Sequence, residues 1–182
     1  PFLNKWFADK PNKRSSHFGI KPRAGGIIFA IFSLLDIFDQ NKIGIYCLPL
    51  AIIGLLDDRF KLPSLLRYIV QIFTVIYLIF NSNFINLISE NYLSIILIIF
   101  FVVALTGIIN FVNFMDGIDG LVGGSMIIIF ATSLFLSNIE MNYLLGSISG
   151  FLILNWSPSK VFMGDVGSTF LGAYFLGILF QS

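Results

Sequence analysis

The sequence contains little charge, one cysteine and one histidine. Only 12% of its 182 residues are charged, about half of the roughly 25% that is usual in soluble proteins. The single cysteine, Cys47, excludes an intrachain disulfide, and the single histidine, His17, excludes a histidine-rich metal site within the chain. The formal net charge is +1, so no strong field favours nucleic acid as a partner.

Apolar side chains are in large excess. Hydrophobic residues make up 57% of the chain, 21 residues are Phe, and the mean hydropathy is +0.90. A soluble domain of this size needs more polar surface to cover its core. The composition therefore excludes an ordinary soluble domain, a disordered chain and a coiled-coil rod. It predicts an all-α, polytopic membrane helix bundle in contact with membrane lipids.

Seven apolar stretches follow a polar opening segment and predict about seven spans in a single membrane domain over 1–182. A span needs about 20 residues, so several stretches must include polar flanks, and the first two also suit one re-entrant hairpin. Because the chain starts at Pro1 and stops inside an apolar run, we expect a piece that is incomplete at both ends. The stretches cover residues 24–38, 43–56, 65–80, 92–112, 121–137, 143–156 and 166–182.

Basic residues collect on one side of the membrane when the spans alternate. Ten of the eleven lie on the side of the opening segment 1–23, and Lys42 is the exception. Because cytoplasmic segments of membrane proteins are rich in Lys and Arg, we expect this side, with the basic segment 1–23, to face the cytoplasm.

The same alternation brings five carboxylates to the cytoplasmic face. Carboxylates at membrane depth are costly and usually functional, although each one alone is equally well explained as a solvated boundary residue. Adjacent like charges repel unless a cation or a basic group neutralises them. Asp and Asn oxygens suit Mg²⁺, which usually takes one or two protein carboxylates and leaves room for phosphates. The five are Asp57, Asp58, Asp116, Asp119 and Asp165.

Four polar residues recur at every third position from 110 to 119. On an ideal helix, residues three positions apart differ in direction by about 60° around the axis, so the first and the last of the four point to opposite sides. All four side chains can face one site only if the helix ends or unwinds near Gly117 and Gly120. A second glycine-rich loop, 164–168, surrounds Asp165 and offers backbone N–H groups to a phosphate. The four residues are Asn110, Asn113, Asp116 and Asp119.

Together these residues resemble the polyprenyl-phosphate N-acetylhexosamine-1-phosphate transferase family, which is glycosyltransferase family 4. Its Asp-Asp pair is matched by Asp57-Asp58, its Asn-x-x-Asn-x-x-Asp-Gly-x-Asp-Gly-Leu block by residues 110–121, and its Phe-x-Gly-Asp-x-Gly-Ser block by residues 162–168. Residues 14–17 and 22–26 look more like the bacterial branch that primes surface polysaccharide, O-antigen or teichoic-acid linkage synthesis than the peptidoglycan branch. Because complete members have about ten or eleven spans, we expect the isolated chain to be inactive or nearly so.

The resemblance implies an activity, a cofactor and a location. N-acetylhexosamine-1-phosphate would pass from a UDP-N-acetylhexosamine to polyprenyl (undecaprenyl) phosphate, and UMP would leave. This would be the first membrane step of cell-wall or lipopolysaccharide synthesis, at the cytoplasmic face of a bacterial inner membrane. Mg²⁺ would be the cofactor, with Mn²⁺ as a substitute. Asp165 is the leading metal ligand by family match, with Asn113 and Asp116 beside it.

The other roles combine the resemblance with residue chemistry. Asp57 and Asp58 are expected to orient the lipid phosphate or accept its proton, although a phosphate monoester with a second pKa near 6 is mostly ionised at neutral pH. Asp119 is expected to bind the nucleotide or to cap the next helix. These residues and Asp116 form the predicted catalytic set. The predicted substrate-binding residues are His17, Arg23, Lys61, Asn110 and Asn113. Lys61 and Arg67 are equally well explained as positive-inside anchors.

Two features predict packing and anchoring. Gly146 and Gly150 form a small-xxx-small pair that predicts helix packing within the bundle, with a homodimer interface as the alternative. Asn155-Trp156 predicts an anchor at the membrane interface.

Three other functions stay open at this point. One is a transporter or channel with Asp116 and Asp119 as ion or proton sites in a broken helix. Another is a CDP-alcohol phosphotransferase, whose pattern requires Ala-Arg after Asp-Gly, where this chain has Ile118-Asp119. The third is a noncatalytic truncated relative that serves as a scaffold.

Overall fold

A computed structural model of the chain describes residues 8–9, 20–82, 92–137 and 139–181. The fold is built from α-helices. Each of the seven predicted apolar stretches contains an α-helix, which confirms the all-α prediction. The α-helices are α2 (Ile27–Ser33), α3 (Ile43–Phe60), α4 (Ser64–Phe80), α5 (Tyr92–Met115), α6 (Leu121–Ser137), α7 (Asn142–Asn155) and α8 (Asp165–Gln181). A 3-10 helix, η1 (Leu35–Asp39), follows α2, and two short strands, β1 (Ala8–Asp9) and β2 (Lys21–Pro22), pair antiparallel.

The helix boundaries follow from the backbone preferences of the residues between them. Lys61 adopts a left-handed conformation with φ of 52° after α3, and Pro63 stands directly before α4. Gly120 and Gly164 have φ of 75° and 78° and stand directly before α6 and α8. Glycine has no Cβ and enters this region without steric cost. The predicted end of the helix near residue 117 is therefore confirmed, since α5 ends at Met115.

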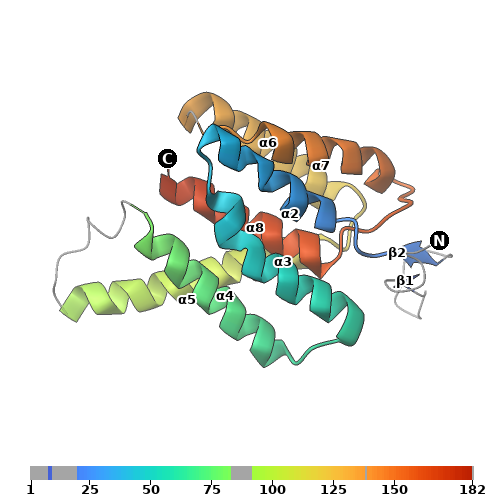
Figure 1. Cartoon of the computed structure of the whole chain (residues 1–182). Helices are drawn as coiled ribbons and strands as arrows, with labels where there is room; N and C mark the ends of the chain where they lie inside the picture. The colour runs from blue at the N-terminus through green and yellow to red at the C-terminus, as the bar shows by residue number, and fades with distance from the viewer. Residues whose placement is uncertain (1–7, 10–19, 83–91, 138, 182) are drawn as a thin grey trace.

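Helix α8 forms the centre of the bundle (Figure 1). Its side chains are buried along nearly its whole length, and it packs against α2, α3, α4, α5 and α6, most extensively against α3. A helix that is apolar all round is typical of such a central position. The largest core side chains include Phe130, Phe170 and Tyr174, and the Tyr174 ring contacts both Phe rings.

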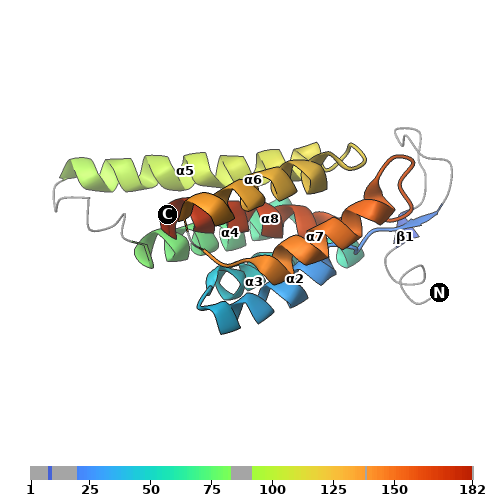
Figure 2. The same ribbon diagram turned by 90° about the horizontal axis from the view of Figure 1, so that it is seen from above.

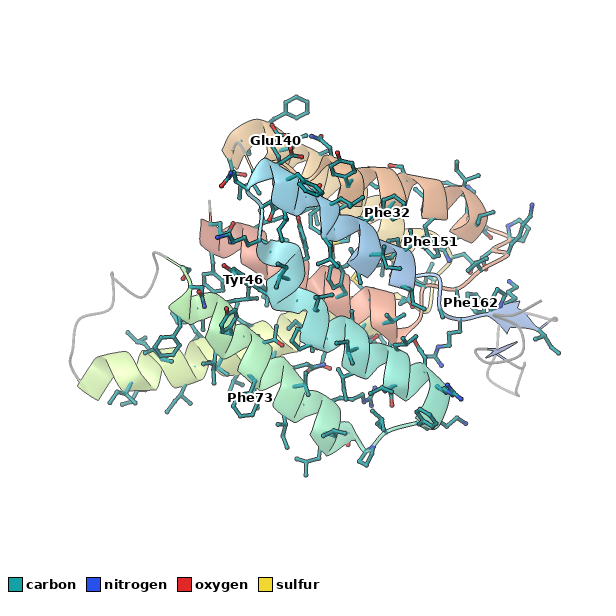
Figure 3. All side chains as sticks on the ribbon, viewed as in Figure 1. Phe32, Tyr46, Phe73, Glu140, Phe151 and Phe162 are labelled. Carbon is teal, nitrogen blue, oxygen red and sulfur yellow. The ribbon has the colours of Figure 1, made fainter. Side chains whose placement is uncertain are left out.

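Successive helices run in alternating directions, so their connections collect at two opposite ends (Figures 1 and 2). Segments 57–64, 116–120 and 156–164 lie at the end that carries β2, which we call the site end. In Figure 3, Phe162 marks the site end and Glu140 marks the opposite end. Among the described basic residues, only Lys42 lies at the opposite end, which agrees with the predicted alternation.

The outside of the bundle is apolar. Large side chains such as Phe73, Phe111, Phe135 and Ile153 are exposed on the helix surfaces. Exposed apolar area of this extent is typical of a surface that faces a membrane or a partner. In the described part of the chain, one helix is long and apolar enough to cross a membrane, Ile95–Met115 within α5. Helix α2 has seven residues, and the count of seven spans stays a prediction.

An apolar groove of about 510 Å³ lies between α2 and α7 and is lined by Phe32, Phe151, Gly146 and Gly150. Figure 3 labels the two aromatic residues. A Cβ atom at either glycine would meet open space within 4 Å. The prediction that this glycine pair packs within the bundle is therefore wrong for the described residues, and the homodimer alternative stays a prediction.

Candidate active site

Two chain segments, 22–26 and 162–163, are joined by backbone hydrogen bonds at the site end. The N–H groups of Gly25 and Gly26 donate to the carbonyls of Phe162 and Met163 at 3.0 and 2.9 Å, and the Phe162 N–H donates to the Pro22 carbonyl at 2.8 Å. A Cβ atom at Gly26 would collide with the backbone of Gly167. Glycine is required at position 26 because the backbones of these two segments approach more closely than any side chain allows.

Four carboxylates and two guanidinium groups meet at this end, and we call them the acidic cluster. Its centre is Asp165, the first residue of α8. Arg23 Nη2 donates to Asp165 Oδ1 at 2.9 Å, and Arg67 Nη1 donates to Asp165 Oδ2 at 3.1 Å. Both oxygens of Asp165 are therefore held by cations from α4 and from the segment before α2. The members are Asp57, Asp58, Asp116, Asp165, Arg23 and Arg67.

Asp58 closes the N-terminus of α8 from another helix. Its side chain is fully buried, and its two oxygens accept the backbone N–H groups of Asp165 and Val166, both at 3.1 Å. Arg23 Nε lies 3.1 Å from Asp58 Oδ1. The first N–H groups of a helix have no partner within the helix, so a carboxylate at this position satisfies them. Its negative charge is also stabilised by the positive end of the helix dipole.

Asp57 faces the other way, toward the turn between α3 and α4. Its Oδ1 accepts the Leu62 N–H at 2.7 Å, and its Oδ2 accepts from Arg67 Nη1 at 2.9 Å. The two neighbouring carboxylates therefore have different structural roles. Asp57 fixes the turn that delivers Arg67, whereas Asp58 fixes the start of α8.

Asn113 and Asp116 reach the cluster from the end of α5. Ser168 donates its hydroxyl to Asn113 Oδ1, and Asp116 accepts a hydrogen bond from the Gly164 N–H. Burial raises the pKa of Asp116 to about 8, and the charges of Asp165 and Asp58 add to this, whereas Arg23 lowers it. Asp116 is thus harder to ionise than an exposed carboxyl group, and a nearby cation would favour its ionised form.

The remaining predicted residues lie outside this cluster. Asn110 lies further along α5, where its amide pairs with Gln71 of α4. Asp119 accepts both the backbone N–H and the hydroxyl of Ser159, at 3.0 and 2.7 Å. Lys61 has an exposed side chain, and His17 lies outside the described residues.

Sequence reasoning missed two polar residues that hold this end together, Gln71 and Ser159, and gave a third, Asn155, another role. Gln71 is buried within the apolar helix α4. Asn155 is also buried; its Oδ1 accepts the Gly120 N–H and its Nδ2 donates to the Val161 carbonyl, both at 2.9 Å. The prediction of an interface anchor is therefore wrong for Asn155, which ties two loops together. Ser159 also accepts a hydrogen bond from Lys21 Nζ at 3.0 Å. A polar residue inside an apolar run was the available signal for Gln71.

The charge and chemistry of the cluster fit a divalent cation. If all its carboxyl groups are ionised, four negative charges face two positive ones, so a charge of −2 is left uncompensated at low dielectric. The donors are hard carboxylate oxygens, which suit Mg²⁺ or Mn²⁺. No three His, Cys, Asp or Glu side chains of the described residues form a metal-binding group by themselves. The arrangement therefore fits a cation held by one or two carboxylates and completed by other oxygens, and not a closed protein cage.

Comparison with known proteins identifies the family. Residues 42–182 match the model of glycosyl transferase family 4. The chain is 35% identical to undecaprenyl-phosphate alpha-N-acetylglucosaminyl 1-phosphate transferase of Thermotoga maritima, over 92% of this chain and 54% of that protein. It is 28% identical to a probable undecaprenyl-phosphate N-acetylglucosaminyl 1-phosphate transferase of Bacillus subtilis, over 94% and 54%. It is 31% identical to phospho-N-acetylmuramoyl-pentapeptide-transferase of Lactobacillus johnsonii, over 83% and 58%.

The chain spans about half the length of these curated relatives. The match covers the two cluster-bearing blocks, 110–121 and 162–168, and the Asp57-Asp58 pair. The chain therefore belongs to glycosyl transferase family 4.

Proposed function

We propose that the complete protein transfers N-acetylhexosamine-1-phosphate from a UDP-sugar to polyprenyl phosphate and releases UMP. The observation that carries this proposal is the acidic cluster, in which two arginines and four carboxylates meet at one end of an apolar bundle. The names of the relatives, which are phosphosugar or phospho-muramoyl-peptide transferases, support the same reaction class.

The physical difficulty of this reaction is that two anions must approach each other. Phosphoryl transfer depends mostly on positioning and on electrostatic stabilisation of charge on the phosphate oxygens. Arg23 and Arg67 have side chains that are 42% and 33% exposed, so they reach both the buried carboxylates and the open side of the cluster. Guanidinium groups bind phosphate oxygens in a fixed geometry. We assign these two side chains to the phosphates of the substrates.

Asp165 and Asp116 are the residues that would hold Mg²⁺. When bound, the ion would neutralise the pyrophosphate and stabilise the leaving oxygen. Asn113 is placed to orient Ser168 and α8 through its side-chain oxygen, which already accepts the Ser168 hydroxyl. Asp57 holds Arg67 in place, and no general base is required because the acceptor phosphate is mostly ionised at neutral pH.

We place the site at the cytoplasmic face of a bacterial inner membrane. The site end carries the described basic residues other than Lys42, and an excess of Lys and Arg is typical of cytoplasmic loops. Sugar nucleotides are polar and charged, so a site that is open to the cytoplasm gives them direct access. We also propose that this reaction is the first membrane step of envelope polysaccharide synthesis, which the undecaprenyl-phosphate acceptor in the relatives' names supports.

The test is UMP release by the full-length protein in membranes, with UDP-N-acetylhexosamines and polyprenyl phosphate. We expect release to require both substrates, to stop with a chelator and to return with Mg²⁺ or Mn²⁺. Asp165→Asn should lower the rate by about 100-fold or more, whereas Asp39→Asn, an exposed carboxylate at the opposite end, should change it less than two-fold. No release from folded protein, or equal rates in the two variants, would refute the proposal. The 182-residue chain alone should release little or no UMP.

A further inference from the structure

A buried amide side chain, Gln71 of α4, pairs with a partly buried one, Asn110 of α5, beneath the acidic cluster. Gln71 Nε2 donates to Asn110 Oδ1 at 3.1 Å, and Asn110 Nδ2 donates to Gln71 Oε1 at 2.8 Å. Asn110 Nδ2 also donates to the Thr106 carbonyl at 2.9 Å. Gln71 is 3% exposed. Each amide therefore serves as both donor and acceptor for the other.

This pair supplies a directional contact between two helices whose other contacts here are mostly apolar. The other residues of α4 near Gln71 are mostly apolar, with Ile69, Val70, Ile72 and Phe73 as immediate neighbours. Apolar contacts alone allow two helices to slide or rotate with little change in buried area, because they have no preferred direction. An amide without a partner in such a place costs several kcal/mol. The reciprocal pair therefore fixes the register and the rotation of α4 against α5.

The pair lies one helical turn away from two members of the site. Arg67 precedes Gln71 by four residues on α4, and residues i and i+4 share a helix face. Asn113 follows Asn110 by three residues on α5, and its oxygen accepts the Ser168 hydroxyl of α8. Arg67 in turn contacts Asp57 and Asp165. Any change in the register between α4 and α5 therefore moves Arg67 relative to the start of α8.

We propose that Gln71 and Asn110 are positioning residues that hold Arg67 against Asp165 for phosphosugar transfer. This inference rests on the proposed function for its kinetic consequence, and on the contacts above for its structural one. Asn110 then serves the substrates through the placement of Arg67 and not by touching them. Gln71 acquires a role in the reaction although it has no contact with the cluster in the structure.

The kinetic test uses four variants of the full-length protein, assayed by UMP release. Gln71→Leu and Asn110→Leu each remove one amide and replace it with a side chain of similar size. The double variant Gln71→Asn with Asn110→Gln exchanges the two partners. Thr74→Val is the matched control, because Thr74 is buried on α4 less than one turn beyond Gln71. Misplacement of a catalytic group by about 1 Å costs about 100-fold in rate. We expect Gln71→Leu and Asn110→Leu to lower kcat by about 10- to 100-fold with KM changed less than about three-fold.

Rescue separates positioning from mere packing. The exchanged pair should recover kcat to within about five-fold of the native protein, since it restores both hydrogen bonds at the same total side-chain length. Thr74→Val should keep kcat within two-fold even if its melting temperature falls as much as that of Gln71→Leu. A kcat in Gln71→Leu equal to that of Thr74→Val, or a folded exchanged pair without recovery, would overturn the proposal.

A second readout needs no turnover. Phenylglyoxal modifies accessible arginines, and peptide mass spectrometry resolves Arg67 from Arg59, which lies at the same end and stacks on Phe60. We expect Gln71→Leu to raise the modification rate of Arg67 several-fold, with Arg59 unchanged and Thr74→Val like the native protein. An unchanged rate at Arg67 overturns the inference. If the native protein releases no UMP but Arg67 still becomes reactive, the proposed function fails and the positioning of Arg67 stands.

Discussion

Asp58 should be needed for the stability of the fold and not only for chemistry. Its buried carboxylate accepts two N–H groups at the start of the central helix α8, both at 3.1 Å, and lies 3.1 Å from Arg23 Nε. Asp58→Ala leaves both N–H groups without a partner in a buried position. Each such loss costs about 1–3 kcal/mol.

The expected total is about 3–5 kcal/mol of unfolding free energy, in the range for breaking one side of a buried charged pair. We add little for the lost attraction to Arg23, because that side chain is 42% exposed and solvent screens it. Asp39→Ala is the control, since Asp39 is exposed at the opposite end and such surface substitutions usually stay within about 0.5 kcal/mol.

The assay is unfolding of the purified protein in detergent, followed by amide hydrogen exchange of the α8 start. Asp58→Ala should lower the melting temperature clearly more than Asp39→Ala. The Asp165 and Val166 amides should exchange faster, while amides near the C-terminal end of α8 change little. A variant that loses UMP release but keeps native stability and native exchange at these two amides would refute the reasoning. Asp58 would then act only on the substrates.

Three further predictions concern other parts of the fold. Asp36→Ala should lower the melting temperature clearly more than Asp39→Ala, because the buried Asp36 carboxylate accepts the Tyr143 and Leu144 N–H groups at the start of α7, at 3.0 and 3.3 Å, and each buried N–H group left without a partner costs about 1–3 kcal/mol; equal melting temperatures of the two variants would contradict this. Asn155→Leu should lower UMP release and loosen loop 157–162 to proteolysis, because two buried hydrogen bonds are lost; wild-type cleavage would argue against it. Gly26→Ala should reduce the yield of folded protein through collision with Gly167, whereas Gly124→Ala, at a site with open space, should not.

The two carboxylates of the Asp-Asp motif contact different helices and have different roles. Asp57 and Asp58 are adjacent in the sequence, yet they point to different helices, α4 and α8. The sequence predicts that both face one membrane boundary because they follow an apolar stretch. It does not predict which of them caps α8, because that depends on how α3 is rotated about its axis.

Hydrophobicity in the sequence was sufficient to locate the helices. Each apolar stretch became a helix because the backbone of an apolar segment satisfies its hydrogen bonds internally, and the helix ends followed from Pro63, Gly120 and Gly164. The alternation of these stretches also placed Asp57, Asp58, Asp116 and Asp165 at one end. These features are local, or depend only on the order of the helices.

Tertiary structure alone decided the pairings. Asp58 meets Val166 across 108 positions, Gln71 meets Asn110 across 39, and Arg23 meets Asp165 across 142. Which side chains meet depends on the rotation, tilt and register of each helix, and these are set by packing around α8 and not by any local pattern. The sequence by itself thus determined the helices, their alternation and the chemistry available at the site end. The packing determined which residues bind, which ones cap a helix and which ones hold the others in place.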